Sequence, residues 1–152
     1  MTTIEGDLIL LTLDGHFDVL IHGCNCFCTM GAGIARIIQE EFPEAYAADL
    51  VTTKGDRNKL GSYSQAKVVR ANHEITIVNG YTQFHYHGDS VLVDYEAVRT
   101  LFSTIKSDFS GSRIGYPKIG AGLAGGDWSR IAAIIDEELQ GENHTLVVLP
   151  SS

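Results

Sequence analysis

Long apolar runs are missing from this sequence of 152 residues, and none of its hydrophobic stretches approaches the roughly twenty residues that a membrane-spanning helix needs. The first residues carry no basic stretch followed by an apolar one, which is the pattern of a secretory signal. Lysine and arginine number only 11 against 19 aspartates and glutamates, so the net charge is −8. Such a balance disfavours binding of long nucleic acid through its phosphates. We therefore expect a soluble, cytoplasmic protein that does not bind membranes and takes a small ligand.

Cysteine is also scarce, and the three cysteines, Cys24, Cys26 and Cys28, stand close together after His22. If this segment is extended, the four side chains share one face, because strand side chains alternate. Structural zinc sites, however, use Cys-x-x-Cys pairs with a second ligand pair elsewhere, and the sequence offers no such second pair. Reduced, half-buried thiols are the simpler interpretation. We expect neither a metal nor a cofactor.

Internal repeats, low-complexity tracts and an interdomain linker are absent, so residues 1–152 are predicted to form a single domain. Short apolar stretches predict strands at 8–13, 17–22, 64–71, 75–81, 114–116 and 145–149. Helical spacing of apolar residues predicts helices at 34–42, 44–52, 94–109 and 131–139. Strands that alternate with helices predict a three-layer α/β/α domain with a central mixed sheet.

Two glycine-rich turns, residues 30–35 and 119–126, each lie between an apolar run and a helical stretch. A residue without a Cβ lets backbone N–H groups approach an anion, and a helix N-terminus favours that anion by a few tenths to about 1 kcal/mol. Two such turns could hold a diphosphate from both sides; purely structural turns are the alternative. In the second turn, the acidic residue of a Rossmann site would fall beyond the next helix and not at the end of a second strand, so a dinucleotide site is disfavoured. Neither turn continues into Gly-Lys-Ser or Gly-Lys-Thr, so a P-loop site is disfavoured as well.

In their order along the chain, these motifs resemble the macro domain, the ADP-ribose-binding module. Four blocks carry the resemblance: residues 5–8, residues 18–25 with His-Gly-Cys-Asn at 22–25, the turn at 30–35, and the turn at 119–126 that leads to Trp128. The nearest likeness is to the branch that includes the yeast ADP-ribose 1″-phosphate phosphatase and the terminal ADP-ribose glycohydrolase. The resemblance spans nearly the whole chain and implies the macro-domain fold with ADP-ribose as ligand.

The resemblance also implies roles for individual residues. Asp7 would accept a hydrogen bond from the adenine amino group, and Asn25 would bind the distal ribose through its amide. The main-chain amides of the two turns would hold the diphosphate. The ligand-binding residues implied in this way are Asp7, Leu8, Gly23, Cys24, Asn25, Met30, Gly31, Ala32, Gly33, Ile34, Ala35, Ile119, Gly120, Ala121, Gly122, Leu123, Ala124 and Gly125. Alternatively, Asp7 only shapes a turn and Asn25 only stabilises one.

Departures from the family pattern bear on catalysis. The glycohydrolase of this branch uses a lysine and an aspartate at positions where this chain has Gln83 and Ala124, and an amide cannot form a Schiff base. His22 matches a histidine of the phosphatase-like sequences and could orient water or donate a proton. The predicted catalytic residues are therefore His22, Asn25 and Asp127. A hydrogen-bonded histidine at a strand end and a helix cap at Asp127 are the alternatives.

The resemblance thus implies a hydrolase that binds ADP-ribose and releases phosphate from ADP-ribose 1″-phosphate. Two alternatives stay open. One is a reader that binds ADP-ribose on modified protein or nucleic acid without turnover, and the other is a hydrolase that removes ADP-ribose from modified macromolecules. His85, His87 and Asp89 form a polar cluster in a loop, and the sequence assigns no role to them.

Overall fold

A computed structural model describes residues 1–88 and 90–150 of the chain. Six strands form one sheet in the order β1-β6-β5-β2-β4-β3. They are β1 (Thr2–Glu5), β2 (Val19–Cys24), β3 (Tyr63–Arg70), β4 (His73–Tyr81), β5 (Ile114–Tyr116) and β6 (His144–Val148). β3 runs antiparallel to β4, whereas the other neighbouring strands are parallel. The sheet is therefore mixed, as the sequence predicts.

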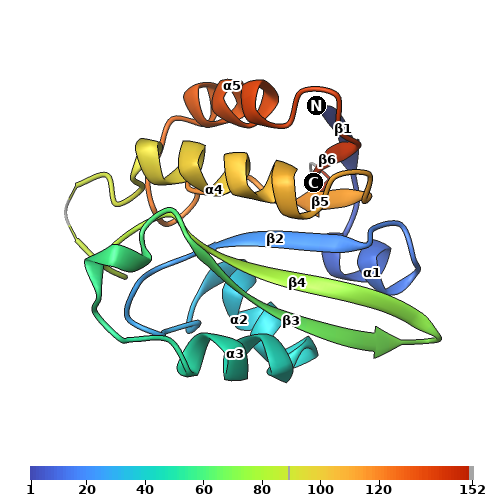
Figure 1. The fold of residues 1–152 in the computed structure, drawn as a ribbon, viewed down its shortest axis with the longest axis horizontal. Helices are drawn as coiled ribbons and strands as arrows, with labels where there is room; N and C mark the ends of the chain where they lie inside the picture. The colour runs from blue at the N-terminus through green and yellow to red at the C-terminus, as the bar shows by residue number, and fades with distance from the viewer. Residues whose placement is uncertain (89, 151–152) are drawn as a thin grey trace.

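Helices cover both faces of the sheet, as Figure 1 shows. The core on one face lies under α4 (Tyr95–Asp108) and α5 (Trp128–Glu138). The core on the other face lies under α1 (Leu8–Leu13), α2 (Gly33–Glu41) and α3 (Pro43–Leu50). A short 3₁₀ helix, η1 (Arg57–Lys59), precedes β3. These three layers confirm the predicted α/β/α architecture.

The middle of the sheet brings the two glycine turns to one edge. β2 lies between β5 and β4, and all of its residues except Gly23 are buried, as expected for a central strand covered on both faces. Because β2 and β5 are parallel neighbours, their carboxyl ends meet at the same edge of the sheet. The chain runs from β2 through the first glycine turn into α2, and from β5 through the second into α5. Ligands of open α/β sheets bind at such an edge.

The first part of the chain differs from the sequence prediction. Residues 8–13 are predicted as a strand but form α1, whose buried side chains Leu8, Ile9 and Thr12 follow helical spacing. The Asp7 side chain caps this helix, since its Oδ1 accepts from Leu10 N at 3.0 Å. A short, largely apolar run fits a strand or a buried helix equally well, which explains the error. The edge strand β1, which pairs with β6, was not predicted.

The other predicted helices and strands are confirmed, with small shifts at their ends. Pro43 opens α3 at a position where its missing N–H costs no helical hydrogen bond. Across the described part of the chain, no helix has both the length and the hydropathy that crossing a bilayer requires.

Candidate functional site

A cavity of about 520 Å³ opens at the carboxyl ends of β2 and β5. Both glycine turns contribute to its walls, together with the end of β2 and the segment that follows β4. Its lining residues are Gly23, Cys24, Asn25, Thr29, Gly31, Ala32, Gly33, Ile34, Ala35, Gln83, Tyr86, Pro117, Lys118, Ile119, Gly120, Gly122, Leu123 and Ala124. The structure thus brings the two turns together in the lining of one cavity.

The first turn presents the start of α2 to this cavity. Asp7, Asp94 and Asp127 cap α1, α4 and α5 with their side chains. The N-cap of α2 is instead Ala32, which has extended backbone and no side-chain cap hydrogen bond in the described structure. Four N–H groups at a helix start lack partners within the helix, and here no capping side chain takes one of them. Together with the helix dipole, these amides suit a negatively charged group.

The second turn is held tightly against the loop before α4. Gly126 N donates to Gly120 O at 2.7 Å, which closes the turn. Gly120 has a φ of +74°, and a Cβ added there would lie 2.6 Å from Val93 Cγ2, so only glycine fits. The tip of the turn reaches the opposite wall, because a Cβ added at Gly33 would lie 3.6 Å from Leu123 Cδ1. The two turns therefore approach each other across the cavity.

Asn25 lines the cavity and also organises the loop after β2. Its Nδ2 donates to Thr29 O and to Thr29 Oγ1, both at 2.9 Å. Its Oδ1 accepts from Phe27 N at 2.8 Å. The two amide hydrogens are thus committed within the loop, while Oδ1 keeps a second lone pair that could accept from a ligand hydroxyl. The predicted turn-stabilising contact and a ligand contact are compatible.

His22 lies within β2 and does not line the cavity, because its side chain is fully buried on the sheet face that bears α2 and α3. Its Nε2 lies 2.7 Å from Asn79 Oδ1, and Asn79 Nδ2 donates to Ala45 O. Asn79 therefore presents its oxygen, so Nε2 of His22 carries the proton. Burial lowers the pKa of His22 to about 4, against an opposing effect of the Asn79 hydrogen bond. Near neutral pH the imidazole is uncharged.

The cysteines diverge after the strand ends. Cys24 Sγ lies 3.5 Å from His22 Nε2, and burial raises the pKa of its thiol well above the usual value. Cys26 Sγ donates to Gln83 O at 3.5 Å, and Cys28 Sγ donates to Asp49 O at 3.3 Å. The condition under which the four side chains would share one face is not met, because β2 ends at Cys24. No group of three or more potential metal-ligating side chains occurs among residues 1–88 and 90–150.

Several predicted site residues lie outside the lining. Asp7 and Leu8 follow β1, two strands from β5 but at the same edge of the sheet, and Asp7 is the exposed cap of α1. Asp127 caps α5: its Oδ1 accepts from Ser129 N at 3.0 Å. The remaining predicted residues that do not line the cavity are Met30, Ala121 and Gly125.

Five lining residues were not among the predicted site residues: Thr29, Gln83, Tyr86, Pro117 and Lys118. Thr29 and the pair 117–118 flank the glycine turns, so extending each turn by one or two residues would have found them. Gln83 and Tyr86 come from the segment after β4, which reaches the cavity because β4 is the neighbour of β2. Strand order is a long-range property that no local sequence pattern reports.

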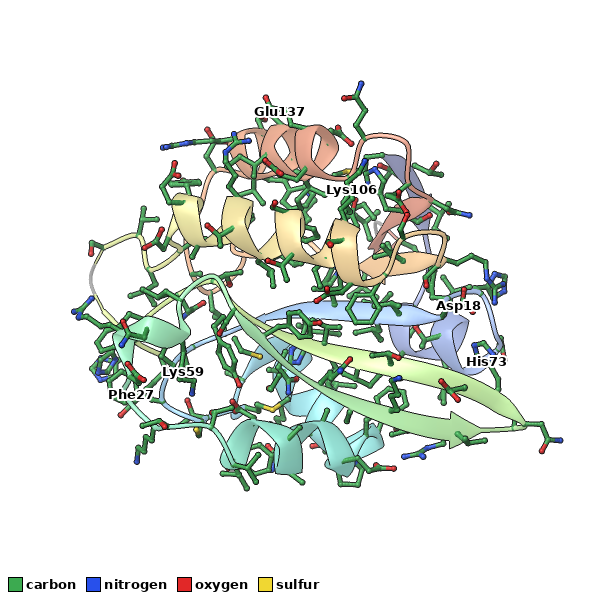
Figure 2. The ribbon with its side chains drawn as sticks, in the orientation of Figure 1. Asp18, Phe27, Lys59, His73, Lys106 and Glu137 are labelled. Atoms are coloured by element: carbon green, nitrogen blue, oxygen red, sulfur yellow. The ribbon has the colours of Figure 1, made fainter. Side chains whose placement is uncertain are left out.

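An aromatic cluster forms the rim beside Tyr86, which is 50% exposed. The ring of His85 lies 4.5 Å from that of Tyr86 and 4.7 Å from that of Phe27, between centroids. His85 Nδ1 also accepts from the backbone N of Tyr86 at 3.0 Å. Figure 2 shows Phe27 and Lys59 at this end of the sheet and Asp18 and His73 at the other. Asp89, which the sequence groups with His85 and His87, lies outside the described residues.

Comparison with known proteins gives one relative by sequence and several by structure. No family model matches the chain. An uncharacterized 17.5 kDa protein of enterobacteria phage T4, from the tk-vs intergenic region, is 35% identical over 139 residues, which cover 88% of this chain and 86% of the phage protein. The macrodomain of Thermus aquaticus DarG superposes with a TM-score of 0.75 at 21% identity, covering 98% of this chain and 97% of its own.

A second solved structure, Thermosipho africanus DarTG in complex with ADP-ribose, matches with a TM-score of 0.75 at 17% identity. The match covers 99% of this chain and 42% of that one. Identities this low report the fold, and the fold agrees with the sheet order and layers described above. The chain therefore belongs to the same family as the phage T4 protein and has the macrodomain fold.

Proposed function

We propose that this protein binds ADP-ribose in the cavity between the two glycine turns and hydrolyses the phosphate of ADP-ribose 1″-phosphate. The observation that carries the binding proposal is the pair of turns, which face each other across one cavity, with the uncapped start of α2 in one wall. The structural neighbour solved with ADP-ribose supports this choice of ligand. The motif His-Gly-Cys-Asn at 22–25, which resembles phosphatase-like sequences, supports the choice of reaction.

The diphosphate would lie between the amides of the two turns, which donate hydrogen bonds without being charged. The distal ribose would lie toward Asn25, whose Oδ1 has a free lone pair. The adenine would lie toward Asp7 and Leu8, because these residues follow β1 at the same edge of the sheet. This order matches an elongated ligand that runs across the ends of β1, β6, β5 and β2.

Hydrolysis in this cavity would depend on positioning. The described lining residues include no carboxylate and no histidine, so neither of these general bases touches the described part of the cavity. We assign His22 a positioning role, since its neutral, buried imidazole fixes Asn79 and lies against Cys24. Asp127 is assigned the role of helix cap. Oriented amides can still hold a phosphate and a water molecule for attack, which supports slow turnover.

The same absence of a carboxylate and a histidine from the described lining favours a second candidate, a reader that binds ADP-ribose without turnover. A reader and a phosphatase share the ligand and differ only in phosphate release. The alignment of Gln83 and Ala124 with the lysine and aspartate of the glycohydrolase weighs against a covalent hydrolase.

Calorimetric titration with ADP-ribose and with AMP tests the binding proposal, because AMP lacks the second phosphate and the distal ribose that this cavity is proposed to hold. We expect ADP-ribose to bind and AMP to bind at least tenfold more weakly. A phosphate-release assay with ADP-ribose 1″-phosphate then separates the candidates: release supports the phosphatase, and tight binding without release supports the reader. Borohydride treatment should trap no ADP-ribosyl adduct, since Gln83 offers no amine. Equal affinity for AMP and ADP-ribose would contradict the proposed site.

A further inference from the structure

Among the described residues that line the cavity, Lys118 is the only one with a charged side chain. It lies two residues beyond the end of β5, at the start of the second glycine turn, and its side chain is exposed. No carboxylate accompanies it in that lining. Elsewhere, arginines are matched with acids: Arg99 with Glu137 at 2.8 Å and Arg113 with Asp18 at 2.9 Å. Within the described chain, Lys118 makes no ion pair of this kind.

This placement runs against the overall charge of the protein. A net charge of −8 repels an approaching anion and lowers its local concentration over most of the surface. The cavity combines neutral amide donors with one ammonium group and no opposing carboxylate in its described lining. The cavity lining is therefore more positive than the net charge of the protein would suggest.

We propose that Lys118 determines the charge specificity of the cavity by contacting the phosphates of the ligand. This inference rests on the proposed function and goes beyond it by naming the residue that selects the ligand class. The amides of the two turns recognise the shape of a diphosphate and keep their donors whatever the ligand charge. The ammonium adds an attraction that grows with ligand charge and weakens with salt. Lys118 thus favours ligands with more phosphate groups over uncharged ribosides.

The test compares Lys118→Gln and Lys118→Arg with a matched control, Lys67→Gln. Lys67 is an exposed lysine of β3, near Asp18 at the opposite end of the sheet, and its loss changes the net charge by the same amount. At low ionic strength, Lys118→Gln should lower the affinity for ADP-ribose about fivefold and the affinity for ADP-ribose 1″-phosphate by more. The affinities of Lys118→Arg should stay close to those of wild type. In about 1 M salt the difference from wild type should nearly vanish, because the Debye length falls to about 3 Å. Circular dichroism should show that all variants fold.

Equal affinities for Lys118→Gln and wild type at low salt would overturn the inference while leaving the proposed function intact. An equal loss of ADP-ribose affinity in Lys67→Gln would also overturn the inference, because the effect would then come from the net charge of the protein and not from the cavity. If wild-type protein fails to bind ADP-ribose, the proposed function falls and this inference falls with it. A salt-dependent loss of ADP-ribose affinity that occurs in Lys118→Gln and not in Lys67→Gln supports the inference.

Discussion

His22 illustrates how burial sets the chemistry of one side chain. It lies in the central strand, next to the cavity residue Gly23, yet its ring points away from the cavity and contacts Asn79 and Cys24. Sequence resemblance draws attention to this position but cannot tell which face of the strand the ring occupies. The face follows from alternation along β2: Gly23 meets the second turn, so His22 meets the layer of α2 and α3.

The pKa of His22 predicts a pH dependence of stability. A histidine in the unfolded chain takes up a proton near pH 6.5, whereas His22 in the folded protein takes one up only near pH 4. The unfolded state therefore binds more protons between these values, and the free energy of unfolding should rise with pH from about 4 to 6.5, by up to about 3 kcal/mol from this residue. Urea unfolding of wild type and His22→Gln between pH 4.5 and 7.5 measures it.

The variant His22→Gln keeps a donor for Asn79 but has no titrating group. Its stability should therefore change less with pH than that of wild type, while its affinity for ADP-ribose should remain within about twofold because the side chain does not reach the cavity. Parallel pH profiles for the two proteins would show that the burial of His22 does not control stability in this range.

Variants of Asp127, at the start of α5, can distinguish a helix-capping residue from a catalytic one. Removing the cap in Asp127→Ala should cost about 1 kcal/mol of unfolding free energy, because Ser129 N loses its acceptor. Asp127→Ser supplies another capping oxygen and should recover most of that loss. Chemical denaturation measures both. If phosphate release fell at least 100-fold in Asp127→Ser while its stability matched wild type, Asp127 would be a catalytic residue after all.

Helices and strands differ in how readily this sequence predicts them. The amphipathic helices α4 and α5 follow from apolar residues at helical spacing, and both begin at an aspartate cap. Residues 8–13 are apolar except for Thr12, and so short a run shows no clear helical periodicity, so a strand is expected where α1 forms. β1 is exposed at the sheet edge and has no apolar run to reveal it. Its pairing with β6 arises only once the sheet assembles.

The complete molecule should respond to its ligand as one cooperative unit. Binding to the folded state alone adds about 2.7 kcal/mol of stability when free ligand is 100 times its Kd. For a chain of 152 residues this corresponds to a rise of roughly 5 to 10 °C in Tm. Thermal unfolding with ADP-ribose and with adenosine measures the rise. A single transition that shifts only with ADP-ribose would support both the site and our proposal of one domain over residues 1–152.

Sequence reasoning identifies the residues that line the cavity where a contiguous motif forms the wall, and it misses them where strand order decides. The glycine turns were found because they are contiguous in sequence. Gln83 and Tyr86 reach the cavity only because β4 pairs with β2, with Cys24 opposite Tyr81. Lys118 adjoins the second turn, but a motif defined by glycine spacing does not include the charged residues that flank it.

The uncapped start of α2 has a consequence for mutagenesis. Donors that belong to the main chain survive the removal of any side chain, so Ile34→Ala would leave every amide of residues 31–35 in place. The proposed contacts of these amides with a phosphate would then look dispensable. Substitutions that alter the backbone, such as proline for Ile34, which deletes an N–H, are the ones that expose such a site. Unchanged ligand affinity in Ile34→Ala, together with a loss in Ile34→Pro, would therefore be a signature of recognition by the peptide chain itself.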